Sequence, residues 1–203
     1  LSLNDMEGVV RLQKVVLTGS LSIEAVGALI LTVRFLPEYG LRKALRWGVF
    51  HSISAFCNAG FDIFGCITPG ASLMEFQSDP VVLLTLSALV IVGGLGFLVW
   101  QDVILNRRFQ KLTVYTKLVL LTTATLLLAG MAAVALTEWN NPDTLGTMST
   151  GDKLLNSFFQ SVTLRTAGFV SFDQAGMTDG CKGLSVMLML VGSALLADLA
   201  GLE

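Results

Sequence analysis

The chain has 203 residues, of which 53% are hydrophobic and only 14% are charged. Soluble domains carry about a quarter of charged residues, so this composition predicts a membrane protein and argues against an ordinary soluble domain. The net charge of −2 gives no support for a nucleic-acid partner. The sequence opens on Leu1 rather than on methionine, which is compatible with a piece of a longer protein.

Three apolar runs are long enough to cross a bilayer as helices, namely residues 15–33, 81–100 and 118–136. The run 81–100 contains no charged side chain, and we expect it to cross the membrane. A fourth run, residues 184–197, stops early, so we expect the last span to be cut short or broken in mid-membrane. The sequence therefore predicts a protein that crosses the membrane several times.

Glu24 interrupts the first apolar run. A carboxylate at that depth must face the protein interior or a water-filled cavity. Two interpretations remain open. Glu24 lies on a cation path, or it forms a structural hydrogen bond with the backbone or a hydroxyl of a neighbouring helix. We favour the structural interpretation.

Three glycines, Gly93, Gly94 and Gly96, lie inside the run 81–100. They allow close packing against another helix, or they form a flexible point near a gate. We favour packing, because glycine is common in membrane spans. We therefore expect Gly93→Ala to be tolerated much better than a change in the repeated glycines described next.

Two further apolar segments, residues 44–57 and 154–164, are too short to span a bilayer and have the length of re-entrant segments. Residues 50–61 and 158–169 around them align without a gap, at an offset of 108 residues, and both copies begin with Phe and end in Ala-Gly-Phe. Irregular backbone at membrane depth is tolerated only where it lines a pore or is buried in protein. The repeat thus predicts two re-entrant loops.

The pattern of span, re-entrant loop and span occurs twice, over residues 1–111 and 112–203. Two crossings per unit return the chain to the side on which it started, so the two units are predicted to be parallel and to share an axis along the membrane normal. Such a geometry suits a pore on that axis.

Acidic residues concentrate on the predicted re-entrant side, where they would attract cations to the mouth of a pore. The simpler interpretation is that loops in water need charge, and it accounts for part of the pattern. The residues concerned are Glu38, Asp62, Glu75, Asp79, Glu138, Asp143, Asp152, Asp173 and Asp179.

The two loop sequences, Phe-His-Ser-Ile-Ser-Ala-Phe-Cys-Asn-Ala-Gly-Phe and Thr-Leu-Arg-Thr-Ala-Gly-Phe, carry a family resemblance. They resemble the Trk/Ktr/HKT superfamily of potassium transporters, and look most like the membrane subunit of bacterial Ktr systems. The resemblance covers nearly the whole chain, as the second and most of the third of four repeats. It implies an all-α membrane protein of tandem span–re-entrant pore loop–span repeats, parallel, around a pseudo-fourfold pore axis.

The resemblance also implies functional residues and partners. The transported ion would be K⁺, with a link to Na⁺ left open. The complete subunit would form a homodimer in the plasma membrane and would be gated by a cytosolic nucleotide-binding ring. The family's gating loop is not recognisable near the C-terminus. The implied ion-binding filter comprises Asn58, Ala59, Gly60, Thr166, Ala167 and Gly168, flanked by Cys57, Phe61, Arg165 and Phe169.

The chemistry of such loops can also be argued from the residues. A dehydrated K⁺ ion needs carbonyl oxygens in place of water, and glycine adopts positive φ at little cost. The negative end of each short helix favours a cation. We expect Arg165 to point away from the ion and to bind backbone carbonyls or a carboxylate behind the filter. We expect His51 to be a hydrogen-bonded helix residue.

Other classes of function are less well supported. An intramembrane enzyme would need a Ser–His pair, an HExxH motif or paired membrane aspartates, and the sequence has none of these, so we assign no catalytic or metal site. A truncated or non-conducting membrane assembly subunit remains the alternative. Cys57, Cys66 and Cys181 lack metal or redox spacing, and we interpret them as reduced, buried thiols.

Overall fold

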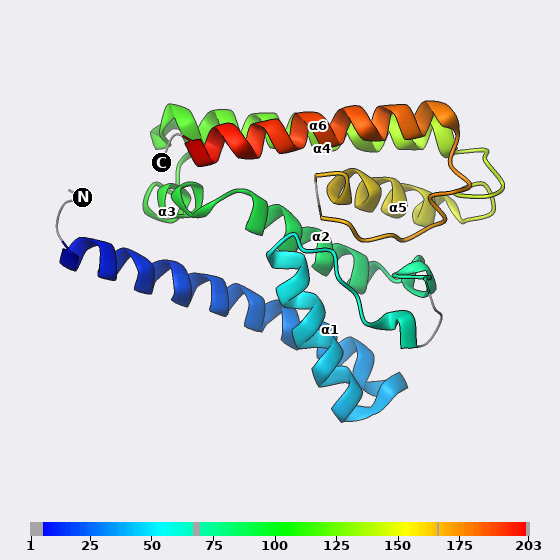
Figure 1. The fold of residues 1–203 in the computed structure, drawn as a ribbon, viewed down its shortest axis with the longest axis horizontal. Coiled ribbons are helices and arrows are strands. Elements are labelled where there is room, and N and C mark those ends of the chain that lie inside the picture. Colours follow the sequence, from blue (N-terminus) through cyan, green and yellow to red (C-terminus); the bar gives the residue numbers. More distant parts are fainter. Residues whose placement is uncertain (1–5, 67–69, 166, 202–203) are drawn as a thin grey trace.

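The computed structural model describes residues 6–66, 70–165 and 167–201, and these residues form helices and connecting segments without any strand (Figure 1). The prediction of an all-α fold is confirmed for this part of the chain. The helices are α1 (Met6–Phe56), η1 (Phe64–Cys66), η2 (Met74–Phe76), α2 (Pro80–Gly94), α3 (Phe97–Leu105), η3 (Phe109–Lys111), α4 (Val114–Glu138), α5 (Thr150–Thr163) and α6 (Asp179–Gly201).

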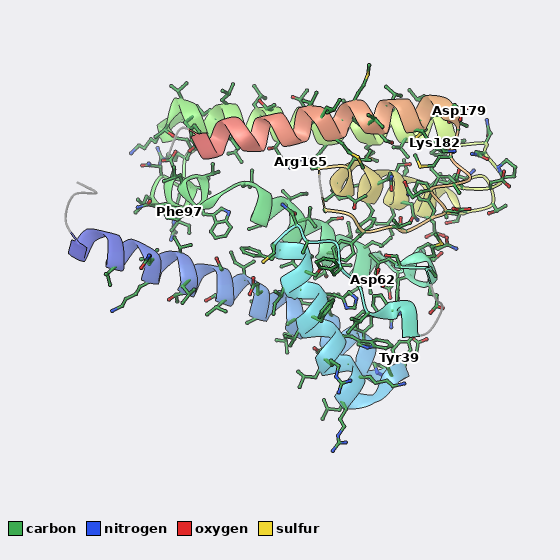
Figure 2. The ribbon with its side chains drawn as sticks, in the orientation of Figure 1. Tyr39, Asp62, Phe97, Arg165, Asp179 and Lys182 are labelled. Carbon is green, nitrogen blue, oxygen red and sulfur yellow. The ribbon has the colours of Figure 1, made fainter. Side chains whose placement is uncertain are left out.

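Helix α1 is two helical segments joined by a sharp turn. Gly40 has φ of 73° and ψ of 162°, a conformation that interrupts the helix and that side chains with a Cβ disfavour. The chain therefore reverses after Tyr39, and residues 41–56 run back beside α2, as Figures 1 and 2 show. Pro37 lies inside the last turn before the reversal. The predicted short segment 44–57 corresponds to this returning helix.

The predicted span 81–100 is not one straight helix, because the chain bends by 95° between α2 and α3. Gly96, at the break, has φ of 78°. In an unbroken helix the carbonyl of Val92 would accept a hydrogen bond from the amide of Gly96. Here the indole Nε1 of Trp100 donates to this carbonyl instead, at 2.8 Å. The interpretation that we favoured for the three glycines was packing, because glycine is common in membrane spans, and the sequence alone did not decide in favour of a break.

Length and composition identify two described helices that can cross a membrane, Gln13–Phe56 and Val114–Glu138, and a third if the bent pair α2 and α3 counts as one span. The second of these contains the predicted run 118–136. Helix α6 continues without interruption to Gly201, so the predicted break in mid-membrane is not present there.

The two halves of the chain share one core. Helix α1 packs on α2, α4 packs on α5 and α6, and α2 packs on α5 across the two halves. The amide of Leu73 donates a 2.9 Å hydrogen bond to the carbonyl of Val170. Asn156 Nδ2 donates a 2.7 Å bond to the carbonyl of Gln77. The loops before α2, before α5 and before α6 gather at one end of the molecule, opposite residues 106–113 (Figure 1).

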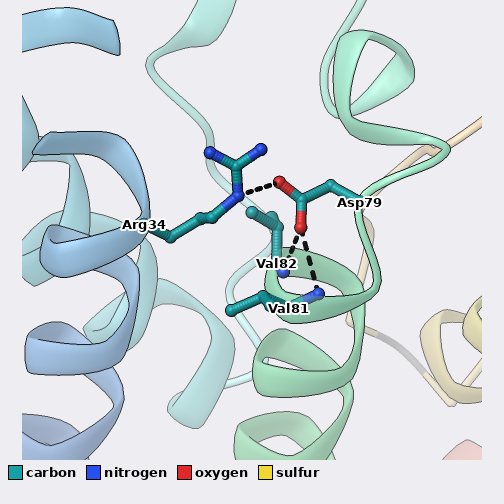
Figure 3. A network of polar contacts seen from close by, with 4 residues as sticks. All are labelled: Arg34, Asp79, Val81 and Val82. Atoms are coloured by element: carbon teal, nitrogen blue, oxygen red, sulfur yellow. Dashed lines mark hydrogen bonds and ion pairs between the residues drawn. The ribbon is translucent and has the colours of Figure 1, made fainter. Parts of the chain in front are cut away.

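An ion pair joins the end of the first long helical segment to the start of α2. Arg34 Nε lies 2.6 Å from Asp79 Oδ2, and Asp79 Oδ1 accepts from the amides of Val81 and Val82 at 3.0 and 3.2 Å (Figure 3). Asp79 is thus both the N-cap of α2 and the partner of Arg34. The contact between Arg34 and Asp79 therefore holds the two ends of the intervening chain, residues 35–78, close together.

In the second half a buried carboxylate also joins the ends of two long helices. Glu138, the last residue of α4, has no exposed surface. Its Oε1 accepts from the amide and hydroxyl of Thr178 at 3.0 and 2.6 Å. Its Oε2 accepts from Thr144 Oγ1 and Asn141 Nδ2, both at 2.7 Å. Four donors hold this carboxylate, so it joins α4 to the start of α6 without a basic partner among the described residues.

We expect Asp79→Ala to destabilise the protein by about 1–2 kcal/mol, because it removes the N-cap of α2 together with the ion pair. Asp79→Asn keeps a capping oxygen and should lose less. Thermal unfolding of the purified protein in detergent measures both. Asp143→Ala is the control, because Asp143 is exposed and its carboxylate has no hydrogen bond to the described residues. Equal melting temperatures for all three variants would contradict this role of Asp79.

Candidate functional site

The two Ala-Gly-Phe sequences lie where two short helices end close together. Residues 41–56 of α1 lead into the first loop, and α5 leads into the second. In each loop the alanine amide donates back to the last turn of its helix, since Ala59 N donates to the carbonyl of Ser54 at 2.9 Å and Ala167 N donates to the carbonyl of Thr163 at 3.0 Å. Both helices therefore direct the negative end of their dipole at the loops.

The two loops touch through their glycines. Gly60 has φ of 69° and Gly168 has φ of 85°. A Cβ atom placed on Gly60 would overlap the carbonyl oxygen of Ala167 and would lie 2.8 Å from Cα of Gly168. A Cβ atom on Gly168 would lie 3.4 Å from Cα of Gly60. Both the backbone angle and the contact thus require glycine at position 60, while position 168 is constrained mainly by its angle.

A hydroxyl group near the end of each short helix fixes the residue that follows the glycine. Ser54 Oγ donates a 2.7 Å hydrogen bond to the carbonyl of Phe61, and Thr163 Oγ1 donates a 2.8 Å bond to the carbonyl of Phe169. The two hydroxyls differ by one position in the repeat alignment. They nevertheless hold equivalent carbonyls, so each loop is closed on its own helix.

His51 supports the chain beyond the first loop. Its Nδ1 lies 2.7 Å from the carbonyl of Trp47, and its Nε2 accepts from the amide of Ile63 at 3.4 Å. One tautomer, with the proton on Nδ1, satisfies both contacts. The imidazole stacks on Phe64, with ring centroids 4.1 Å apart. The prediction that His51 is a hydrogen-bonded helix residue is confirmed.

A pair of glutamines joins α5 to the chain beyond the second loop. Gln160 Nε2 donates to Gln174 Oε1 at 2.9 Å, and Gln174 Nε2 donates to Gln160 Oε1 at 3.1 Å. Sequence patterns gave no sign of this pair, because Gln174 lies in an irregular loop.

The predicted site residues fall into two groups by exposure. In the first loop Cys57, Ala59 and Phe61 are exposed, and Asn58 and Gly60 are half-buried; in the second, Ala167 and Phe169 are buried and Gly168 is exposed. Asn58 has φ of 51°, a left-handed conformation that Asn tolerates. Thr166 lies outside the described residues.

Two predictions about side chains in this region need correction. Cys57 is exposed rather than buried, whereas Cys181 is buried as predicted; the side chain of Cys66 lies outside the described part. Arg165 is buried, but its guanidinium has no hydrogen bond or ion pair with a carbonyl or carboxylate of the described residues. It lies instead beside Gly94 of α2.

Glu24 does not form the structural hydrogen bond that we favoured. Its carboxylate is half-buried and has no hydrogen bond within the described ranges. Its backbone carbonyl accepts a 2.7 Å bond from Ser52 Oγ, which joins the long segment of α1 to its returning segment. Within the same ranges, no group of three or more His, Cys, Asp and Glu residues could hold a metal ion.

Gly93 is in direct contact with the end of the first short helix. A Cβ atom at this position would overlap the carbonyl oxygen of Phe56 and lie 2.9 Å from its carbonyl carbon. The packing interpretation of Gly93 is therefore right. The expectation that Gly93→Ala does much less than a change in the repeated glycines loses its basis, because the obstructing atoms belong to the backbone that leads directly into the first loop.

Comparisons with known proteins identify related sequences over nearly the whole chain. The sequence profile of the TrkH family, described as cation transport protein, matches residues 2–198. The chain is 42% identical to the Ktr system potassium uptake protein B of Bacillus subtilis (strain 168), over 97% of this chain and 43% of the relative. It is 38% identical to the potassium/sodium uptake protein NtpJ of Enterococcus hirae, over 100% of this chain and 44% of the relative.

A third relative, the Ktr system potassium uptake protein B of Vibrio alginolyticus, is 43% identical over 90% of this chain and 40% of its own length. The chain thus spans less than half the length of these relatives. The relatives are transport proteins and not enzymes, which confirms both the family resemblance and the choice of a transporter over an intramembrane enzyme.

We expect Gly93→Ala to destabilise the protein by about 1–3 kcal/mol, the typical cost of overpacking. Gly19→Ala is the matched control, because Gly19 is also helical and a Cβ atom there would meet no atom within 4 Å. That control should be neutral or stabilising by up to about 1 kcal/mol. Thermal unfolding in detergent compares the two variants, and equal melting temperatures would show that the close contact with Phe56 is not a constraint.

Proposed function

Because this chain belongs to the TrkH family of cation transport proteins, we propose that its two Ala-Gly-Phe loops are re-entrant pore loops of a potassium translocation subunit. In this proposal the loops contribute part of a selectivity filter, formed by Asn58, Ala59, Gly60, Thr166, Ala167 and Gly168. Residues 1–111 and 112–203 are two parallel repeats of span, pore loop and span around a pseudo-fourfold axis.

The direct backbone contact between the two loops is the observation that supports the proposal best. Two segments 108 residues apart meet at their glycines, each at the end of a short helix and each closed by a hydroxyl on the following Phe carbonyl. Two unrelated surface loops would have no reason to share this arrangement. A repeated structure whose copies meet on one axis accounts for it directly.

The chemistry of the loops suits a potassium ion. A K⁺ ion entering a filter must exchange its water for oxygen ligands, and rigidly held backbone carbonyls supply these. The helices that end at the two loops add partial negative charge on the same side. Acids in the loops at one end of the molecule, among them Glu75, Asp79, Asp143 and Asp173, would raise the local cation concentration.

The remaining parts of the proposal rest on the relatives. The B. subtilis relative is a potassium uptake protein and the E. hirae relative a potassium/sodium uptake protein, so we propose K⁺ as the transported ion, with Na⁺ as a second ion. The chain covers 43% of the first, and further segments would complete the filter. A multi-pass plasma-membrane location, a homodimer and a cytosolic nucleotide-binding gating ring belong to the same proposal.

The filter glycines provide the central test, in the complete transporter that contains these repeats. We expect Gly60→Ser and Gly168→Ser to reduce potassium uptake and the preference for potassium over sodium, because a side chain at positive φ costs about 1–2 kcal/mol and turns the carbonyls. Gly60→Ser should be the more severe, since only its Cβ overlaps the opposite loop. Uptake of K⁺ and Na⁺ by a host that lacks its own potassium uptake, normalised to expression, measures both.

Gly19→Ala serves as the control, because it changes a helical glycine with no close neighbour. If both serine variants kept their potassium affinity and selectivity, the Ala-Gly-Phe loops would not form the selectivity filter. The relative severity is a separate test, since a milder effect at position 60 would contradict the contact geometry.

A second test concerns the number of loops. Two loops provide only part of a carbonyl ring, and an unsatisfied polar group at membrane depth costs several kcal/mol. We therefore expect the 203-residue chain alone to show no potassium-selective flux in liposomes, whereas the complete transporter does. Selective flux from the short chain would mean that copies of it associate into a filter by themselves.

A further inference from the structure

Equivalent positions in the two loops differ in residue and in surroundings. Cys57 and Arg165 both precede the filter residues, at the offset of 108 residues that relates the repeats. Cys57 is exposed, whereas Arg165 is only 8% exposed. The arginine therefore lies inside the protein, between elements from both repeats, and is not directed into solvent.

Two glycines from different helices make room for Arg165. A Cβ atom on Gly94, the last residue of α2, would lie 3.9 Å from Nη2 of Arg165. A Cβ atom on Gly192 of α6 would lie 3.6 Å from its Cα and 4.0 Å from its Cβ and Cγ. The main chain and stem of the arginine thus pack on α6 and its charged end reaches α2. The side chain connects the outgoing helices of both halves.

The charge of Arg165 is unpaired within the described part of the chain. No acidic or carbonyl oxygen there accepts from its guanidinium. A buried cation needs compensating negative charge. Helix α2 ends at Gly94, where the chain bends by 95° towards α3, and the end of a helix carries partial negative charge from its free carbonyls. The guanidinium lies beside that end.

Asn58 of the first loop lies at the same point. A Cβ atom on Gly94 would lie 3.3 Å from Nδ2 of Asn58. The other atom of that amide, Oδ1, is buried and has no hydrogen-bond partner within the described ranges. A half-turn of the amide would exchange the two atoms and place the acceptor on the side of Gly94, where Arg165 lies. Asn58 and Arg165 thus both lie beside this helix end, and the turned amide would direct its acceptor towards the unpaired donor.

We propose that Arg165 is a positioning residue for the ion pathway: its positive charge lies beside the broken end of α2 at Gly94, balances the partial negative charge of that end, and supports Asn58 of the opposite loop from behind. This proposal rests on the proposed function of the two loops. It adds to that function a residue of the second loop, Arg165, that supports the first loop. Arg165 touches no ion in this role. It acts through the helix end and through the side chain of Asn58.

The test replaces Arg165 in the complete transporter by Lys, Gln and Met. Lys keeps the charge, Gln keeps polarity alone, and Met keeps a similar apolar bulk. We expect Arg165→Lys to retain the preference for potassium over sodium within about twofold, and Arg165→Gln and Arg165→Met to lower it by about tenfold. Arg108→Gln is the control, because it removes an exposed positive charge far from the loops.

A second readout does not depend on flux. Binding of K⁺ to the folded protein raises its melting temperature, so the difference between melting in KCl and in NaCl reports the filter in detergent. We expect this difference to persist in Arg165→Lys and to shrink in Arg165→Gln and Arg165→Met. A purely packing role predicts instead that Met performs as well as Lys.

The outcomes separate this proposal from the proposed function. If the unmodified transporter and Arg108→Gln prefer potassium, the proposed function stands. The role of Arg165 is then overturned if all three variants keep the preference, if Met or Gln keeps it, or if Lys loses it as Gln does. If the unmodified transporter shows no preference for potassium, the proposed function itself is wrong.

Discussion

The contact between the backbones at Gly60 and Gly168 constrains the rest of the molecule. The elements around this contact hold the two loops together. The short helices end at the loops, and the hydroxyls of Ser54 and Thr163 close each loop on its helix. Glycine is required because no other residue allows two chains to approach this closely at positive φ.

Polar contacts at the ends of the long helices also hold the fold together. The two halves of the chain use different chemistry for these contacts. The first half uses an ion pair, Arg34 with Asp79, at a partly exposed position. The second half uses the fully buried carboxylate of Glu138, held by four neutral donors. Exposure decides the choice: an ion pair tolerates water, whereas a buried carboxylate needs complete hydrogen bonding. Each connection holds the ends of two long helices together, α1 and α2 in the first half and α4 and α6 in the second.

The sequence predicted those features that leave a local pattern. The all-α fold, the two short helices and the turn at each Ala-Gly-Phe follow from apolar length and from an ungapped repeat. The bend at Gly96, the contact of Gly93 with Phe56 and the burial of Arg165 leave no such pattern, because each depends on which helix lies opposite. The sequence does not distinguish a glycine in a packed helix from one at a break or in an Ala-Gly-Phe loop, so the role of a glycine can be assigned only once its φ and its neighbours are known.

The two loops carry different side chains at equivalent positions, and the coordination of an ion in the proposed filter explains why this is tolerated. A K⁺ ion is coordinated by backbone carbonyls, and therefore restricts the backbone and not the side chains behind it. Positions 57 and 165 have different surroundings, since Cys57 is exposed whereas Arg165 lies between α2 and α6, so a cysteine can suit one loop and an arginine the other. Ser54 and Thr163 illustrate the same freedom, since they reach equivalent carbonyls from positions one residue apart in the alignment. The symmetry of the repeats is thus kept in the loop backbone, while the supporting side chains are fitted to each repeat separately.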